Sequence, residues 1–397
     1  DFYRFVIDRV ALIKVKLHQN DEAIDFFEKM NDRGLRLSAT DLMKNLLFSQ
    51  FSNDAYRFAQ SHWDDSIRSL SKLDKALPRT MAFLLKALLT KHTKQSVPAS
   101  KVYREWKGLV KNSEDAQEFF ADVKSATSFL EQTSSGQVPA GEAIAASRYL
   151  GAKQFWTLIL ATREYDSDVA GKIASFVNAR TVLSLLAEER SQDYERLVSP
   201  WANEIWSLGR NYGHNTSFED FLKLEQSKVA QDSGLRLLKL LDVQLRLLTY
   251  AADGSRVRLV LALAASEMEN VLDSDLAAQP LSTFITSDAY DVDHIFPRAL
   301  VGKSNGDLDT EERVDHLGNL ALLHNKENRS AGKRPPSEKV DKYFNSSLAL
   351  SRSLSWRLET STEAIAGEKI RASEQNKDPL QLESWDSTAI RARTELY

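Results

Sequence analysis

Apolar residues recur at helical spacing over most of the chain, from about Phe51 to Leu272. Two of the clearest faces are Ile173, Phe176 and Val177, and Trp201, Ile205 and Leu208. Spacings of three and four residues are those of amphipathic helices that bury one face. The segment Arg256–Leu272 alternates briefly like a strand, yet its length favours a helix. The pattern predicts a mostly α-helical protein with one or more helical bundle domains.

The pattern changes near the C-terminal end, where two short alternating runs replace the helical spacing. Residues 291–296 (DVDHIF) form the first run, and Leu320–Leu323 form the second, directly after Asn319. Short runs with period-two alternation indicate strands, so we expect a hairpin with a long loop. Pro335–Pro336 is then suited to begin a helix. The inward stripe of that helix is expected to be Val340, Tyr343 and Phe344.

The first sixty residues predict two helices separated by a turn. Apolar residues at helical spacing mark the first helix at Asp21–Met30, and Gly34 is suited to the turn after it. Ser38 and Asp41 form a capping box that opens the second helix. On these grounds alone, the segment is a helix-turn-helix packing unit.

The composition restricts the compartment and the kinds of site that the chain can carry. The 397 residues include no cysteine, which removes disulfides, thiolate nucleophiles and cysteine-bound zinc. No apolar run approaches the ~20 residues that cross a bilayer, and no signal-peptide pattern opens the chain. We therefore expect a cytoplasmic protein with no membrane segment. The net charge of -4 restricts any contact with nucleic acid to a local surface.

The hairpin region carries the most specific motif in the chain. The residues DVDHIFP (291–297), followed by GNLALLHNKENRSAGK (318–333), resemble an HNH nuclease of the form found in GmrSD-type C-terminal domains. The resemblance implies a small ββα-metal nuclease module with its core at about residues 289–350. Matched by position, His294 is implied to be the general base, and Asn319 the residue that steadies the hairpin. Asp293 and Asn328 are implied to be the metal ligands.

These residue types suit the hydrolysis of a phosphodiester. A neutral imidazole titrates near neutral pH and can take a proton from water. One carboxylate oxygen and one amide oxygen can hold a hard divalent cation while positions stay open for phosphate and water. Oxygen donors favour Mg²⁺ or Mn²⁺ over zinc, so we expect one of these two ions as the cofactor.

The name HNH stands for a His-Asn-His pattern. In this sequence the third position of that pattern is Asn rather than His. His324 and Asn325 therefore compete with Asn328 for the metal role. The cysteines that staple some HNH proteins through zinc are absent, so apolar packing must hold the hairpin together.

A basic segment follows the second strand and is the expected contact with DNA. Residues 326–342 hold six basic and three acidic side chains, so their net charge is +3 in an acidic chain. Such a run by itself is commonly a solvated helix face. Beside the nuclease motif, Arg329, Lys333 and Arg334 are expected to bind DNA phosphates.

A second resemblance lies near the N-terminal end. The segment FFEKMNDRGLRLSATDLMKN (26–45) resembles the end of the N-terminal domain of GmrSD-type and SspE-like restriction proteins. That domain resembles the ParB fold and carries a nucleotide-handling Asp-Gly-Gln-Gln-Arg motif, which this sequence lacks. If the resemblance holds, the nucleotide site either lies outside this chain, in an N-terminal domain of a longer, full-length protein, or has been lost.

The two resemblances divide the chain into three expected regions. Residues 1–60 would end a ParB-like domain, residues 61–272 would form a helical region, and residues 273–397 would form the nuclease domain. The expected function is a metal-dependent DNA endonuclease, nicking or cutting double-stranded DNA, in bacterial defence against phage or modified DNA. The sequence leaves open whether the protein forms a homo-oligomer. The alternatives are a non-catalytic DNA-binding or scaffold protein with a degenerate nuclease fold, and an RNA-directed nuclease.

Overall fold

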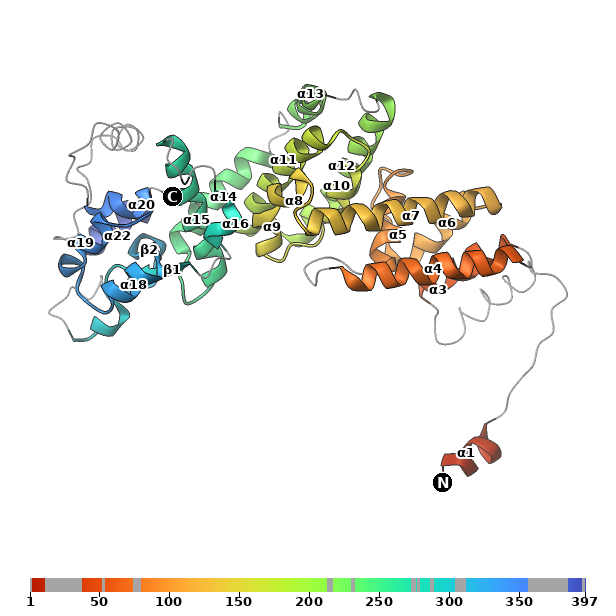
Figure 1. Cartoon of the computed structure of the whole chain (residues 1–397), viewed down its shortest axis with the longest axis horizontal. Helices are drawn as coiled ribbons and strands as arrows, with labels where there is room; N and C mark the ends of the chain where they lie inside the picture. Colours follow the sequence, from red (N-terminus) through yellow and green to blue (C-terminus); the bar gives the residue numbers. More distant parts are fainter. Residues whose placement is uncertain are drawn as a thin grey trace. The chain divides into compact units, whose positions relative to one another are not determined.

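A computed structural model of the chain describes residues 2–10, 38–51, 54–73, 80–212, 217–229, 233–272, 276, 279–285, 289–303, 312–355, 385–394 and 397. The described residues are mostly helical, which confirms the predicted mostly α class (Figure 1). The chain divides into two units, each with its own buried residues. One unit holds residues 1–73, 79–92 and 97–128, and the other holds residues 74–78, 93–96 and 129–397. The domain boundaries expected at residues 60 and 272 stay predictions.

The regular elements among the described residues of the first unit are helices. Its elements are α1 (Phe2–Arg9), α3 (Ala39–Ser49), α4 (Asp54–Lys72), α5 (Met81–Leu89), the 3-10 turn η1 (Ala99–Lys101), α6 (Val102–Leu109) and the start of α7 (Ser113–Ser134). The predicted capping box of α3 is confirmed. The backbone N–H of Asp41 donates to Oγ of Ser38 at 3.2 Å, and that of Ser38 donates to the Asp41 carboxylate at 3.1 Å. The predicted helix Asp21–Met30 lies outside the described residues.

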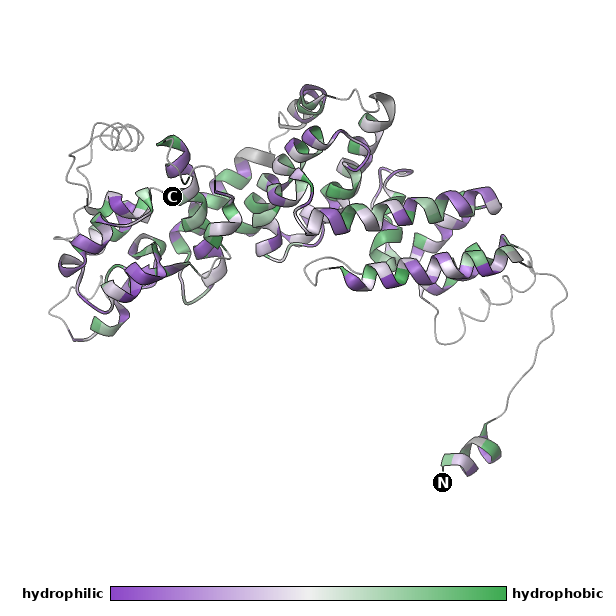
Figure 2. Ribbon diagram, in the orientation of Figure 1, coloured by the Kyte–Doolittle hydropathy of each residue, from purple (hydrophilic) through white to green (hydrophobic). Residues whose placement is uncertain are grey.

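Helix α5 supplies much of the core of this unit because almost all of its residues are apolar. Leu84, Leu85 and Leu88 are fully buried. The buried indole of Trp106 donates to the carbonyl of Leu85 at 3.0 Å, which satisfies its one donor. The longer helices α4 and α7 carry hydrophobic and hydrophilic residues in alternating bands, as amphipathic helices do (Figure 2).

The second unit begins with a series of helices. These are α8 (Pro139–Ala143), α9 (Ala145–Tyr149), α10 (Trp156–Ala161), α11 (Ser167–Leu186), α12 (Ser191–Tyr212), α13 (Phe218–Val229), α14 (Ser233–Leu247), α15 (Gly254–Val271) and α16 (Leu281–Ile285). By length and composition alone, α11 is the one described helix that could cross a membrane, although the sequence was expected to contain no such run. Half of its most apolar window is buried inside the unit, and a core helix has the same composition.

Helix α15 is the element on which the C-terminal hairpin rests. Asp253 caps it by accepting from the backbone N–H of Arg256 at 2.9 Å, and Val257, Leu261 and Ala265 are fully buried. The helix predicted over Arg256–Leu272 is therefore confirmed. Its buried side packs against α16 and against the second strand of the hairpin.

The hairpin consists of β1 (Tyr290–His294) and β2 (Leu320–His324), which pair in antiparallel register as expected. Asp291 lies opposite Leu323, and His294 lies opposite Leu320. Successive side chains of a strand point to opposite faces. Val292 and His294 therefore share one face of β1, and Asp291 and Asp293 share the other.

Each face of the hairpin packs into a different hydrophobic cluster. Val292, Leu320 and Leu322 join the cluster that contains α15. Ala321 and Leu323 join a second cluster, whose other buried members are Ile295, Phe296, Ala331, Tyr343, Leu354, Trp385, Ala389 and Ile390. The hairpin is thus covered on both sides, without zinc-binding cysteines, as the sequence requires.

Short helices surround the hairpin. They are η3 (Arg298–Leu300), η4 (Leu317–Asn319), α18 (Asn325–Ala331), η5 (Pro336–Glu338), α19 (Val340–Phe344), α20 (Ala349–Arg352), η6 (Ser353–Ser355) and α22 (Ser387–Thr394). The helical segment expected to begin at Pro335–Pro336 is confirmed as η5, with Pro335 at its N-cap, followed by α19. A separate helix, α18, which His324 caps, was not expected. The expected inward stripe is wrong in one position. Tyr343 is fully buried, but Phe344 is 44% exposed.

Candidate functional site

Asn319 connects three segments around the end of the hairpin. Its amide donates to the carbonyl of Phe296 at 2.9 Å and to that of Val314 at 2.7 Å. Its oxygen accepts from the backbone N–H of Phe296 at 2.9 Å and from the indole of Trp385 at 3.0 Å. The side chain is fully buried and makes the four hydrogen bonds that an amide can make. Asn319 therefore acts as a positioning residue, not as a group that touches substrate.

His294 lies at the end of β1, with its ring directed toward the loop between the strands. Its Nε2 donates to Oδ1 of Asp315 at 2.8 Å, and the ring meets that of Tyr250 edge-on at 5.5 Å between centroids. Arg298 donates to the same Asp315 oxygen, from Nε at 2.6 Å and from Nη2 at 2.5 Å. Asp315 thus orients the imidazole and is itself oriented by an arginine.

The surroundings of His294 keep its imidazole neutral near pH 7. Burial lowers its pKa below the ordinary value of 6.5; the hydrogen bond to Asp315 opposes this shift, and the charge of Arg298 adds to it. A neutral ring that donates from Nε2 carries its lone pair on Nδ1. That nitrogen can accept a proton from water.

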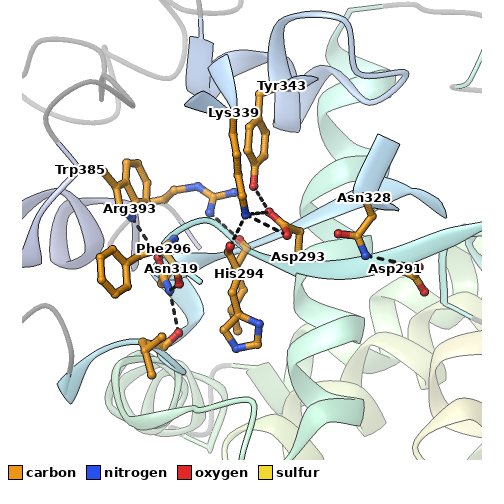
Figure 3. Close-up of polar contacts among 12 residues, drawn as sticks. Asp291, Asp293, His294, Phe296, Asn319, Asn328, Lys339, Tyr343, Trp385 and Arg393 are labelled. Carbon is orange, nitrogen blue, oxygen red and sulfur yellow. Dashed lines mark hydrogen bonds and ion pairs between the residues drawn. The ribbon is translucent and has the colours of Figure 1, made fainter. Parts of the chain in front are cut away.

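Asp293 lies on the opposite face of β1 and is almost inaccessible. Its carboxylate accepts from Nζ of Lys339 at 2.9 and 3.1 Å and from the hydroxyl of Tyr343 (Figure 3). Lys339 is fully buried and also donates to the carbonyl of His294 at 2.7 Å. Asp293 and Lys339 therefore form a buried ion pair that connects β1 to the segment before α19.

Burial of this cluster alters the titration of both partners of Asp293. Burial lowers the pKa of Lys339, and the charge of Asp293 opposes that shift. Burial first, and the charge of Asp293 second, raise the pKa of Tyr343 well above 10. Tyr343 therefore stays a neutral hydrogen-bond donor.

Asn328 lies in α18, and its nearest polar partner on β1 is Asp291 rather than Asp293. Its Nδ2 donates to Oδ2 of Asp291 at 3.4 Å, and both residues are only partly buried. In Figure 3 this pair lies to one side of the Asp293 cluster, and the imidazole of His294 points away from both. The structure thus brings Asn328 to the acidic face of β1 but does not gather it with His294.

The two competing residues at the start of α18 have different surroundings. Nδ1 of His324 accepts from the backbone N–H of Lys326 at 3.3 Å, so its imidazole caps the helix. The side-chain oxygen of Asn325 is buried, and no donor to it is found in the described part of the chain. Among the described residues, no three His, Asp or Glu side chains cluster as a metal site.

The predicted DNA-binding residues are available at the surface. Arg329, Lys333 and Arg334 are all exposed, on α18 and the turn after it. Lys339 was counted in the same basic run, but it is buried and neutralised by Asp293. The basic surface is therefore smaller than the sequence suggested, and it consists of these three residues and the exposed Lys326.

Sequence reasoning missed three residues that shape this site. Asp315 and Lys339 each contact a motif residue from a distant position, and Arg298, directly after the motif, contacts Asp315; none has a sequence signal for these contacts. In the closing helix, Arg393 is also buried, with its guanidinium donating to the carbonyls of Gly318 and Leu320. A role for Arg393 in packing, rather than in phosphate contact, follows from that burial.

Comparison with known proteins identifies the part of the chain that contains this site. Residues 243–397 match the sequence model of the C-terminal domain of GmrSD restriction endonucleases. The match includes α15, the hairpin, α18 and the closing helix α22. No curated protein matches the chain.

Proposed function

We propose that this protein is a metal-dependent HNH endonuclease of DNA, because residues 243–397 match the C-terminal domain of GmrSD restriction endonucleases. The observation that supports the proposal best is the position of His294. It is the last residue of β1, and the second strand of the hairpin runs directly into α18, which carries Asn328. The hydrogen bond to Asp315 holds His294 in the tautomer whose Nδ1 can accept a proton. Strand, strand and helix in this order are the elements of a ββα nuclease module.

In the proposed reaction, Nδ1 of His294 takes a proton from the water that attacks the phosphorus atom. The bond between phosphorus and the 3′ oxygen breaks, and that oxygen takes a proton from a solvent water, which leaves a 5′-phosphate and a 3′-hydroxyl. Asp315 balances the charge of the imidazolium that forms, as a carboxylate partner does in other His-dependent sites. Asn319 holds the loop that ends at Asp315 against the strand and so maintains this geometry.

The acidic face of the hairpin fits a hard divalent cation, Mg²⁺ or Mn²⁺. Asp291 offers carboxylate oxygens there, and Asn328 offers its amide oxygen once the amide is turned; such donors suit these ions. When bound, the ion would offset the negative charge that develops on the phosphate and on the leaving oxygen. Asp293 was the expected carboxylate ligand, but its oxygens are occupied by Lys339 and Tyr343.

The proposed substrate is double-stranded DNA, with Arg329, Lys333 and Arg334 binding its phosphates. The family supports a role in restriction, and we propose modified or phage DNA as the target and the bacterial cytoplasm as the setting. The N-terminal resemblance to ParB-like domains stays a prediction, because most of its residues lie outside the described ones.

One observation favours the alternative of a non-catalytic DNA-binding or scaffold protein. His294 and Asn328 lie toward opposite faces of the hairpin, whereas a working site needs both near one phosphate. A degenerate nuclease fold would retain the packing without that convergence.

Cleavage of supercoiled plasmid with Mg²⁺ or Mn²⁺ separates the two functions. His294→Ala is expected to lower the rate by about 10²- to 10⁴-fold, because the proton acceptor is removed. EDTA should stop cleavage by the wild-type protein. His62→Ala, in α4 of the other unit, is the matched control and should cleave at the wild-type rate. Nicking that persists in His294→Ala would remove the base assignment. DNA binding without cleavage in either metal would favour the alternative, and the same assay on RNA tests an RNA-directed nuclease.

A further inference from the structure

The two aspartates on the acidic face of β1 have different neighbours. Asp291 and Asp293 are two residues apart, so their side chains point the same way. Lys339 and Tyr343 approach Asp293, whereas Asn328 approaches Asp291. Only one of the two carboxylates therefore lies beside the amide that is expected to bind the cation.

Asp293 has no capacity left for a cation while the present contacts hold. Both of its oxygens accept from Lys339, one also accepts from Tyr343, and the residue is 5% exposed. If it turned toward a metal, Lys339 would keep only the carbonyl of His294 while remaining fully buried. A buried ammonium without a counter-charge is strongly unfavourable, so the ion pair resists this exchange.

Asp291 has the opposite properties. It is partly exposed, and its contact with Asn328 is a long hydrogen bond of 3.4 Å. Rotation of the Asn328 amide by half a turn would present its oxygen beside the Asp291 carboxylate, since the two ends of an amide have the same shape. Partial exposure also leaves room for the water and phosphate oxygens that complete the shell of Mg²⁺ or Mn²⁺.

A second oxygen lies one helical turn away. Asn325 precedes Asn328 by three residues in α18, so the two side chains are neighbours on the helix surface. Its amide oxygen is buried, and the described residues provide no hydrogen-bond donor for it. A buried acceptor without a donor is costly, and a cation nearby would lower that cost.

We propose that Asp291, rather than Asp293, is the carboxylate that binds the divalent cation together with Asn328. Asp293 instead has a structural role, because the ammonium group of Lys339 occupies the place beside its carboxylate that a metal would take. This inference rests on the proposed nuclease function but concerns only where the cation binds, so metal affinity can test it separately from cleavage.

The test is titration of the full chain with Mn²⁺, followed by calorimetry and by electron paramagnetic resonance of the free ion. Asp291→Asn and Asn328→Ala should each weaken Mn²⁺ binding by at least ~10-fold, as expected when one ligand is removed. The double variant Asp293→Asn/Lys339→Met removes the buried charges together and should bind Mn²⁺ within about twofold of wild type. Asp341→Asn, an exposed aspartate on α19, is the matched control and should not alter binding.

The opposite pattern would overturn the inference. If the double variant loses Mn²⁺ while its circular dichroism is unchanged, and Asp291→Asn retains it, Asp293 is the ligand and the nuclease proposal stands. If the wild type binds no Mn²⁺, this cation site does not exist. If Asp291→Asn loses Mn²⁺ but the wild type cleaves no DNA, the cation site stands and the nuclease proposal fails.

Discussion

The two faces of the hairpin hold their charged groups in different ways. On one face, His294 has Asp315 as its hydrogen-bond partner, and 16% of its side-chain surface is exposed. On the other, Asp293 is 6% exposed at its side chain and accepts from two residues, one of which, Lys339, is fully buried. The two residues are adjacent in the sequence, yet one is accessible and the other is enclosed.

This difference separates a reactive position from a structural one. A partly exposed imidazole with one oriented nitrogen can exchange a proton with substrate or water. A buried carboxylate whose oxygens already accept hydrogen bonds cannot exchange a proton with substrate or water unless the packing around it is broken. In the proposed function, adjacent residues of one motif therefore have different tasks, and each task can be tested separately.

The largest expected effect comes from breaking the enclosed face. Lys339→Met leaves Asp293 as a buried carboxylate without a counter-charge, which should lower the free energy of unfolding by about 3–5 kcal/mol. Urea unfolding would measure this decrease, and adding Asp293→Asn to Lys339→Met should restore most of the stability. Lys342→Met, in α19 just after Lys339 but only partly buried, should change stability by less than ~0.5 kcal/mol. Equal effects of the two lysine variants would contradict the structural role of Lys339.

A smaller effect is expected on the accessible face. Asp315→Asn should lower the cleavage rate by about 10- to 100-fold, the usual cost of removing a residue that orients a catalytic group. Nitrogen NMR of His294 gives a readout that a purely structural role would not move, since the mutation should change the population of the Nε2–H tautomer. If the tautomer and the rate are both unchanged, Asp315 does not position the base.

Much of the hairpin could be predicted from the sequence because its signals are local. The alternation over residues 291–296 and the apolar run at residues 320–323 predicted the strands, and Ser38 with Asp41 predicted the start of α3. The start of α18 was missed for a local reason too. His324 is not a preferred capping residue, so no local signal marked a helix at Asn325–Ala331, whereas the helical segment expected at the prolines is present as η5 and α19.

The pairings of the site could not be predicted in this way, because they join residues far apart in the chain. Lys339 is 46 residues from Asp293, and nothing in the basic run distinguishes the buried lysine from the exposed ones. Asp315 is 21 residues from His294, in a polar loop with several acidic residues. The assignment of Asp293 to the metal followed the motif, whereas its burial is a property of the folded chain.

The smallest expected effect concerns the surface next to the acidic face, where α18 presents its basic residues. Replacing Arg329, Lys333 and Arg334 with alanine should weaken DNA binding equally for all sequences. The slope of log affinity against log salt concentration should fall by about 0.9 for each DNA phosphate that the protein no longer neutralises. Fluorescence anisotropy with a labelled duplex at several salt concentrations measures both quantities.

A control with the same change in charge shows whether this surface, and not net charge alone, binds DNA. Arg57, Arg68 and Lys72 are exposed on α4 of the other unit, and their replacement by alanine also removes two arginines and one lysine. That variant should keep the wild-type salt slope, because long-range effects of exposed charges are screened within about 10 Å at 0.1 M salt. Equal slopes for the two triple variants would show that DNA does not approach the hairpin along α18.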